Sequence, residues 1–186
     1  MCAAREVDVA HVLEPATSSR ARCRGCGRLI EQGTLRFGER MPNSYGEGEM
    51  TLWLHPLCAA YKRPEPLLAA LQAPTAAAGE LPQLAAIARR TLQHERLTRI
   101  DGAERAASGQ ARCRHCREPI ARGSWRVRLV FHDEGGRFNP GGFIHLACAS
   151  AYFEAPAPLE QLLHFSGELS AGERADLAGL MAGNAP

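Results

Sequence analysis

One pattern of cysteine and histidine residues occurs twice in this chain of 186 residues, and its two copies lie 90 positions apart. Each copy reads C-x2-C-x28-H-x2-C. The first copy consists of Cys23, Cys26, His55 and Cys58, and the second of Cys113, Cys116, His145 and Cys148. Other residues repeat at the same spacing: Ile30 matches Ile120, and Arg36 matches Arg126. The sequence therefore contains an internal duplication, and we expect two modules of similar fold.

Three cysteines and one histidine in each copy form the ligand set of a structural zinc site. Thiolate and imidazole groups bind Zn²⁺ with tetrahedral geometry, and four protein ligands leave no coordination position for water or substrate. A metal held in this way cannot act as a Lewis acid in catalysis. We therefore predict two structural zinc ions per chain, one in each copy.

Other uses of these cysteines fit the pattern less well. A disulfide framework needs an oxidising compartment, and nothing in the sequence indicates export. A thioredoxin-like C-x2-C motif would not explain the paired histidine and cysteine at a fixed distance. Neither C-x2-C motif is followed by histidine, which excludes attachment of haem. We expect Cys2, outside the repeat, to be a free thiol, and His115 to be an exposed residue of the second C-x2-C turn.

Residues between the two ligand pairs alternate in polarity, which is typical of a half-buried strand. The apolar positions in the second copy are Trp125, Val127, Leu129 and Phe131. Arg126 and Arg128 lie between them, and Arg36 lies between two apolar residues in the first copy. This alternation predicts a strand in each module with its arginines on a solvent-exposed outer face. The aromatic residues Trp53 and Phe143, two positions before each ligand histidine, indicate a second strand.

Helices are expected after the second ligand pair of each copy. Ser170 and Glu173 form a capping box, and the apolar face that follows contains Leu177, Leu180 and Met181. The corresponding face in the first copy contains Leu84, Ile87, Ala88 and Leu92. These patterns predict an α+β fold in which each module is a short antiparallel sheet with helices. We expect a first module at residues 18–97, a linker at residues 98–108 and a second module at residues 109–183.

The charge of the chain is concentrated in the two modules. The net charge is only +2, but residues 20–63 and residues 112–153 each carry +4. The segment between them is neutral, and both ends of the chain are acidic. Two basic modules between neutral or acidic segments are the electrostatic pattern of a protein that binds phosphate groups. No apolar run approaches the roughly 18 residues that cross a membrane, so no membrane partner is expected.

Two segments of the first module resemble the zinc finger at the N-terminus of poly(ADP-ribose) polymerases, which also occurs in a vertebrate DNA ligase. They are SRARCRGCGRLIEQGTLRF at residues 19–37 and WLHPLC at residues 53–58. Residues 110–127 and 143–148 resemble a second copy of the same finger. The shared features include the long gap between the ligand pairs, the arginine of the strand and the trailing Gly-x-Leu helix.

The resemblance implies recognition of DNA strand breaks through phosphate contacts and through stacking on the base pair that a break exposes. The basic residues that it assigns to DNA are Arg20, Arg22, Arg36, Arg40, Arg112, Arg126 and Arg128. It places stacking in loops at residues 42–50 and 135–140. The family's first stacking position falls on Gly46 and Gly136, so the nearby Tyr45 and Phe138 are expected to stack instead, and the second position falls on Met50 and Pro140. Gln110 replaces an arginine that the family has before the first cysteine.

These features predict a non-enzymatic, zinc-dependent protein that binds nicks or ends of DNA. Outside the repeat, the sequence has no Ser/His/Asp set, phosphate-binding loop or carboxylate pair that would indicate catalysis. Two alternatives remain open, namely a regulatory zinc module that binds another protein and a general binder of single-stranded nucleic acid. The sequence leaves a protein partner and self-association undetermined. A DNA-binding protein of this kind is expected in the cytoplasm or nucleoid of a bacterium, or in a nucleus.

Overall fold

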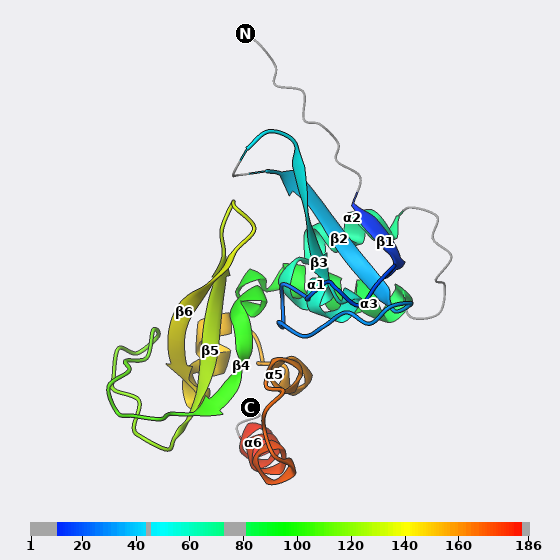
Figure 1. The fold of residues 1–186 in the computed structure, drawn as a ribbon. Coiled ribbons are helices and arrows are strands. Elements are labelled where there is room, and N and C mark those ends of the chain that lie inside the picture. The colour runs from blue at the N-terminus through cyan, green and yellow to red at the C-terminus, as the bar shows by residue number, and fades with distance from the viewer. Residues whose placement is uncertain (1–10, 44–45, 73–80, 184–186) are drawn as a thin grey trace. The chain divides into compact units, whose positions relative to one another are not determined.

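The chain divides into two compact units, each built around one three-stranded sheet (Figure 1). The computed structural model describes residues 11–43, 46–72 and 81–183. The first unit comprises residues 1–89 together with 134–136, and the second comprises residues 90–133 and 137–186. Both sheets are antiparallel and are accompanied by helices, so the predicted α+β class is confirmed.

The first sheet has the strand order β1-β2-β3, so its longest strand lies in the centre. Its strands are β1 (Val12–Pro15), β2 (Leu35–Pro42) and β3 (Glu49–Leu54). Phe37 pairs with Leu54 across β2 and β3, and both side chains are fully buried. The register of β1 places Glu14 directly opposite Arg36. The expected second strand that leads to the ligand histidine is confirmed as β3.

The second sheet repeats this arrangement with the strand order β4-β5-β6. Its strands are β4 (Ile100–Arg105), β5 (Trp125–His132) and β6 (Phe138–His145). Glu104 on β4 lies opposite Arg126 on β5 in the same register as in the first sheet. Val127 and Ile144 are fully buried and pair across β5 and β6.

Helices follow the third strand of each sheet. After β3 come α1 (Pro56–Lys62), α2 (Pro64–Leu71), α3 (Leu81–Gln93) and a 3₁₀ turn at Glu95–Arg99. After β6 come a 3₁₀ turn at Leu146–Cys148, α4 (Ala149–Phe153), α5 (Leu159–Phe165) and α6 (Ala171–Gly183). Proline at the first position of α1 suits a helix start, because that residue needs no backbone N–H there. His55 and Cys58 therefore lie one helical turn apart.

The expected linker at residues 98–108 must be corrected, because it contains β4, a strand of the second sheet. The strand β1 likewise lies before residue 18, outside the expected first module. Both strands are short edge strands held by backbone pairing, and β4 carries polar residues and Gly102. An edge strand with this composition gives no clear alternation of polarity, so the sequence pattern did not reveal it.

The last helix is fixed to the second sheet by polar contacts. The predicted capping box is present, since the backbone N–H of Ser170 donates to Glu173 Oε2 at 2.9 Å. Trp125 Nε1 donates to Asp176 Oδ2 at 2.6 Å, and Arg105 forms an ion pair with the same carboxylate. The predicted apolar face of α6 is only partly buried. Leu177 is fully buried, whereas Leu180 is exposed. The corresponding face of α3 is also partly buried: Leu84 and Ala88 are buried and Leu92 is exposed.

Candidate metal centres and nucleic-acid interface

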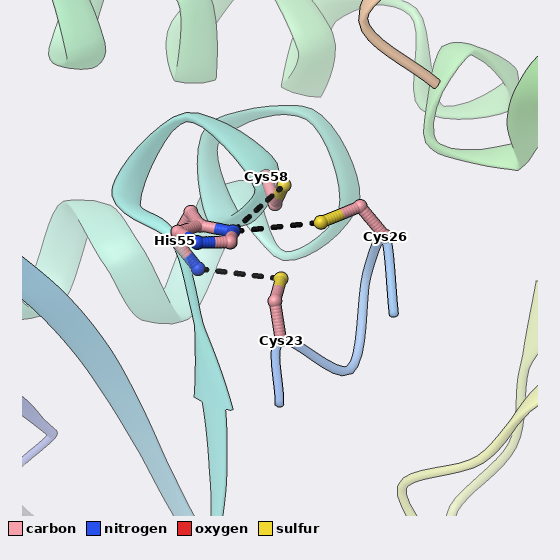
Figure 2. A group of neighbouring side chains, drawn as sticks. All are labelled: Cys23, Cys26, His55 and Cys58. Carbon is pink, nitrogen blue, oxygen red and sulfur yellow. Dashed lines mark hydrogen bonds between the residues drawn. The ribbon is translucent and has the colours of Figure 1, made fainter. Parts of the chain in front are cut away.

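The structure brings the four predicted ligands of each copy into one cluster. The ligand atoms of each set all lie within 4.8 Å of one another. Figure 2 shows the first cluster, in which His55 Nδ1 lies 3.4 Å from Cys26 Sγ and 3.9 Å from Cys58 Sγ. The second cluster has the same distances from His145 Nδ1 to its sulfur atoms. Cys23 and Cys26 come from the turn after β1, whereas His55 and Cys58 come from the junction of β3 and α1.

The outer nitrogen of each ligand histidine is bound to the backbone. His55 Nε2 lies 3.1 Å from the carbonyl oxygen of Leu29, and His145 Nε2 lies 3.1 Å from that of Pro119. A carbonyl oxygen only accepts hydrogen bonds, so Nε2 carries the proton and the neutral ring presents Nδ1 as a ligand. Backbone N–H groups also donate to the sulfurs, as in the contact from His55 N to Cys23 Sγ at 3.3 Å.

Burial and the neighbouring thiols raise the pKa of one cysteine in each cluster, an effect that a divalent cation would offset. Hydrogen bonding with Cys23 and Cys26, together with burial, raises the pKa of the Cys58 thiol above its ordinary range. Burial and then the charge of Cys113 raise the pKa of the Cys148 thiol to about 12. Each cluster thus opposes full deprotonation by itself, whereas a coordinated zinc ion deprotonates its thiols.

Each cluster could therefore hold one zinc ion, consistent with the predicted two structural zinc ions. Three sulfur donors and one imidazole nitrogen are a donor set that suits Zn²⁺. The hydrogen bonds from backbone N–H groups to sulfur and from histidine to carbonyl oxygen supply the outer contacts that such sites need. His115 is exposed and lies outside the second ligand set, as the sequence predicted. Cys2 lies outside the described residues.

The two clusters differ in the turns that present their cysteines. In the first turn, Arg28 Nε donates to Cys26 Sγ at 3.5 Å, and Gly27 has a φ of 73°. In the second turn, Glu118 occupies the position equivalent to Arg28. Arg117 occupies the position of the glycine and has a φ of 70°. A residue with a Cβ atom is strained in this left-handed region, so the second turn is the less stable of the two.

The prediction that Arg36 and Arg126 lie on a solvent-exposed face is wrong. Each residue is only 8% exposed. Arg36 donates from Nε and Nη2 to Glu14 Oε1, at 3.2 and 2.6 Å. Its Cζ atom also lies 3.6 Å from the centroid of the Trp53 ring. The strand β1 and the aromatic residue of β3 therefore cover the Arg36 side chain. The alternation of polarity alone would place this side chain on an exposed face.

The same arrangement occurs in the second module. Arg126 donates from Nε and Nη2 to Glu104 Oε1, at 2.9 and 2.5 Å, and its Cζ atom lies 3.6 Å from the centroid of Phe143. We call each set of glutamate, arginine and aromatic residue an arginine stack. The first arginine stack is Glu14, Arg36 and Trp53, and the second is Glu104, Arg126 and Phe143.

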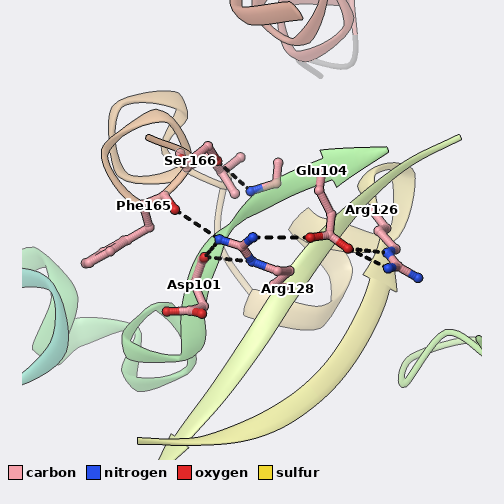
Figure 3. Close-up of polar contacts among 8 residues, drawn as sticks. Asp101, Glu104, Arg126, Arg128, Phe165 and Ser166 are labelled. Carbon is pink, nitrogen blue, oxygen red and sulfur yellow. Dashed lines mark hydrogen bonds and ion pairs between the residues drawn. The ribbon is translucent and has the colours of Figure 1, made fainter. Parts of the chain in front are cut away.

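Arg128 has a structural environment that the sequence did not indicate. Figure 3 shows the carboxylate of Glu104 between Arg126 and Arg128. Arg128 donates to Glu104 Oε2 at 3.2 Å, to the carbonyl oxygen of Asp101 at 2.7 Å and to that of Phe165 at 3.1 Å. These bonds join β4, β5 and the end of α5 and use most of the donors of the guanidinium group. Arg128 is thus held within the module although its side chain stays 37% exposed.

The first module has Gly38 at the position equivalent to Arg128. A Cβ atom on Gly38 would lie 2.7 Å from the Trp53 ring and 2.8 Å from a methyl group of Val12. The larger aromatic residue of the first arginine stack thus occupies the space that a side chain would need. At these two positions the first sheet has glycine and tryptophan, whereas the second sheet has arginine and phenylalanine.

The remaining basic residues that were assigned to DNA are exposed. These residues are Arg20, Arg22, Arg40 and Arg112. Arg22 Nη1 donates to the carbonyl oxygen of Gly27 at 3.3 Å, and Arg112 Nη1 donates to that of Arg117 at 3.2 Å. These two arginines therefore brace the cysteine turns while their side chains stay open to solvent.

The residues that were assigned to stacking lie near the ends of the hairpins. Met50 is half-buried in β3, and Pro140 is exposed in β6. Phe138 is also in β6 and packs with its ring against His132, at a centroid distance of 4.9 Å. The segment expected as a loop in the second module is thus partly strand. Tyr45 lies outside the described residues.

Sequence reasoning missed Glu14 and Glu104, the acidic members of the arginine stacks. A signal was present, because Glu14 and Ala16 match Glu104 and Ala106 at the 90-residue step. The two residues lie before the cysteines, in short strands without a strong apolar pattern. Extending the repeat upstream of the cysteines would have found them.

Comparison with known proteins finds a similarity to part of a longer chain. A poly(ADP-ribose) polymerase from Sarcophaga peregrina is 26% identical to this chain over an alignment of 173 positions, and the match covers 77% of the chain. The match spans 16% of the length of that relative. No protein-family profile matches the chain. Among the described residues, no helix is long and apolar enough to cross a membrane. The chain is thus similar to one part of a much longer protein, and its two Cys₃His clusters fit the zinc fingers that it resembles.

Removal of zinc is expected to unfold both modules. The free energy with which a structural zinc binds is of the order of 10 kcal/mol, and in small modules it becomes free energy of folding. Native mass spectrometry should find two zinc ions per chain, and circular dichroism should show loss of the folded signal after chelation. Fewer than two tightly held ions, or an intact signal without metal, would contradict this prediction.

Exchange of the residues at the left-handed positions should change the two zinc affinities in opposite directions. Relief of the strain at Arg117 is worth roughly 1–2 kcal/mol, or about 5- to 30-fold in affinity. We expect Arg117→Gly to tighten zinc binding at the second cluster, and the reciprocal Gly27→Arg to weaken zinc binding at the first cluster. Competition with a chelator of known affinity measures both. Unchanged affinities in the two variants would show that the turns do not distinguish the sites.

Proposed function

We propose that this chain is a zinc-dependent DNA-binding module that recognises strand breaks or ends. The observation that carries the proposal is the occurrence, in each module, of an arginine stack beside a Cys₃His cluster. An arginine guanidinium held in a fixed plane is suited to phosphate, which it binds through paired hydrogen bonds. The match to a protein named poly(ADP-ribose) polymerase supports the same reading.

The exposed arginines extend the proposed phosphate contact over the surface of each module. In the first module, Arg20 and Arg22 precede the first cysteine ligand and Arg40 lies between the two ligand pairs. In the second module, Arg112 precedes the first cysteine ligand. Such contacts neutralise the DNA backbone without reading its bases, so they favour DNA of any sequence. Both modules carry a net charge of +4 over the segments that hold these residues, which agrees with this role.

Preference for breaks requires a contact that intact duplex does not offer. A nick or an end exposes the face of a base pair, and an apolar side chain stacked on that face gains about 1–3 kcal/mol. Met50 in the first module and Pro140 in the second are the described candidates, since Phe138 already packs against His132. The Cys₃His clusters provide no open coordination position, so we infer that the chain contributes recognition and not catalysis.

Binding to different DNA forms tests the proposed function. Nicked, blunt-ended, closed circular and single-stranded DNA would be compared at several salt concentrations. We expect tighter binding to nicked and blunt-ended DNA than to closed circles, together with a steep salt dependence. Equal affinity per site for closed and nicked circles would reduce the function to general DNA binding. Tight binding to single strands alone, or no DNA binding, would favour the alternatives.

Substitution of Met50 tests whether this residue gives the proposed preference for nicked DNA over closed circles. Met50→Ser should lower the affinity for nicked DNA by roughly 1–3 kcal/mol and leave the affinity for closed circles nearly unchanged. Met181→Ser, in α6, serves as the matched control and should change neither. A parallel loss on both DNA forms would mean that Met50 supports the fold and not the contact with a base.

A further inference from the structure

We propose that Glu14 and Glu104 are positioning residues that present Arg36 and Arg126 to the DNA phosphates. This inference rests on the proposed function and assigns a role to two acidic side chains in a surface that binds an anion. Simple electrostatics predicts that such carboxylates weaken DNA binding. The geometry of the arginine stacks points to the opposite effect.

Each glutamate holds one edge of its arginine. A single oxygen, Oε1, accepts from both Nε and Nη2 in each stack, at distances from 2.5 to 3.2 Å. The strand register places the two residues opposite one another in both sheets, as the pairs Glu14↔Arg36 and Glu104↔Arg126. The carboxylate therefore fixes the rotation of the guanidinium about its long axis.

The aromatic residue covers one face of the same guanidinium group. The distance from Cζ to the ring centroid is 3.6 Å for both Trp53 and Phe143, which is a close contact for a cation over a ring. With one edge and one face occupied, the guanidinium has a single defined orientation. A side chain as long as arginine otherwise loses much rotational freedom on binding a ligand, and here that ordering has occurred on folding.

The remaining edge of each guanidinium is the part that can meet a phosphate. Among the described residues, Nη1 of Arg36 and Nη1 of Arg126 have no hydrogen-bond partner, and neither atom is fully enclosed. Each Nη1 carries two N–H donors. A phosphate oxygen at this edge would receive a charge-assisted hydrogen bond, while the glutamate stays on the opposite edge.

Glu14 gives the cleaner test, because it has one arginine partner. Glu104 also binds Arg128 through Oε2, so its loss would disturb β4 and α5 as well. The side chain of Glu14 is 42% exposed, and the first module has Gly38 at the position where the second module has Arg128. A conservative change at Glu14 therefore alters the orientation of Arg36 with little other effect.

The experiment measures affinity for nicked duplex, and its salt dependence, for the full chain and variants loaded with zinc. Glu14→Asp keeps the charge but shortens the side chain, and Glu14→Gln removes the charge. Both should lose roughly tenfold in affinity, the effect of one hydrogen bond to a charged group. Both should also lose about one unit of log–log salt slope. Glu65→Gln, an exposed glutamate of α2, is the control and should bind as tightly as wild type or slightly more tightly.

A double-mutant cycle separates positioning from a merely structural role. In an Arg36→Ala background, Glu14→Asp should cause no further loss of affinity, because the glutamate acts only through the arginine. Zinc content and melting temperature are followed for every variant. Additive losses, or wild-type affinity in Glu14→Asp, would overturn the inference. If Glu14→Gln fails to retain zinc, the affinity of Glu14→Asp alone tests the positioning role.

Failure of the proposed function has a different signature. Wild-type protein that binds no DNA, or binds closed and nicked circles equally, would contradict break recognition before any variant is compared. An Arg36→Ala variant with unchanged affinity and slope would show that the first arginine stack does not meet phosphate. That result would also exclude the positioning role of Glu14. If Arg36→Ala loses affinity for nicked DNA but Glu14→Asp does not, only the positioning role is excluded.

Discussion

Each module depends on the four-ligand cluster that ties the cysteine turn to the end of the third strand. The ligand pairs are about thirty residues apart in the chain, yet their donor atoms lie within 4.8 Å of one another. Within the described residues, each module consists of a three-stranded sheet and short helices, and aromatic residues make up 6% of the chain. A core of this size gives little stability by itself, so a metal that binds only the folded state supplies what the core lacks.

The cluster also determines where the arginine stacks lie. The backbone N–H of Arg24 donates to the carbonyl oxygen of Trp53 at 2.9 Å, and Arg114 makes the same bond to Phe143. The residue after the first cysteine ligand is thus fixed to the aromatic residue two positions before the histidine ligand. This aromatic residue supports the arginine, and the first strand supplies the glutamate on its other edge. Metal binding and the proposed phosphate contact are connected through a short series of backbone and side-chain contacts.

The sequence predicted the elements whose signal is local or repeated. The ligand sets follow from spacing alone, the strands around Arg36 and Arg126 follow from alternation, and the start of α6 follows from a capping box. The edge strands β1 and β4 were missed because their pairing is made by the backbone and their side chains are mixed in polarity. The burial of Arg36 and Arg126 was missed for the same reason. It depends on a glutamate in those strands, and alternation cannot tell an arginine that faces solvent from one that faces a carboxylate and an aromatic ring.

In the proposed complex, the open edge of Arg36 and of Arg126 meets DNA while the glutamate holds the other edge. Nuclear magnetic resonance of the arginine side-chain N–H groups, recorded during titration with nicked duplex, would detect this contact. The Nη signals of Arg36 and Arg126 are expected to shift and to become protected from exchange with water. The signals of Arg128, whose donors are bound within the module, should stay in place. Signals of Arg36 and Arg126 that stay unchanged at saturation with nicked DNA would rule out a contact between these arginines and DNA.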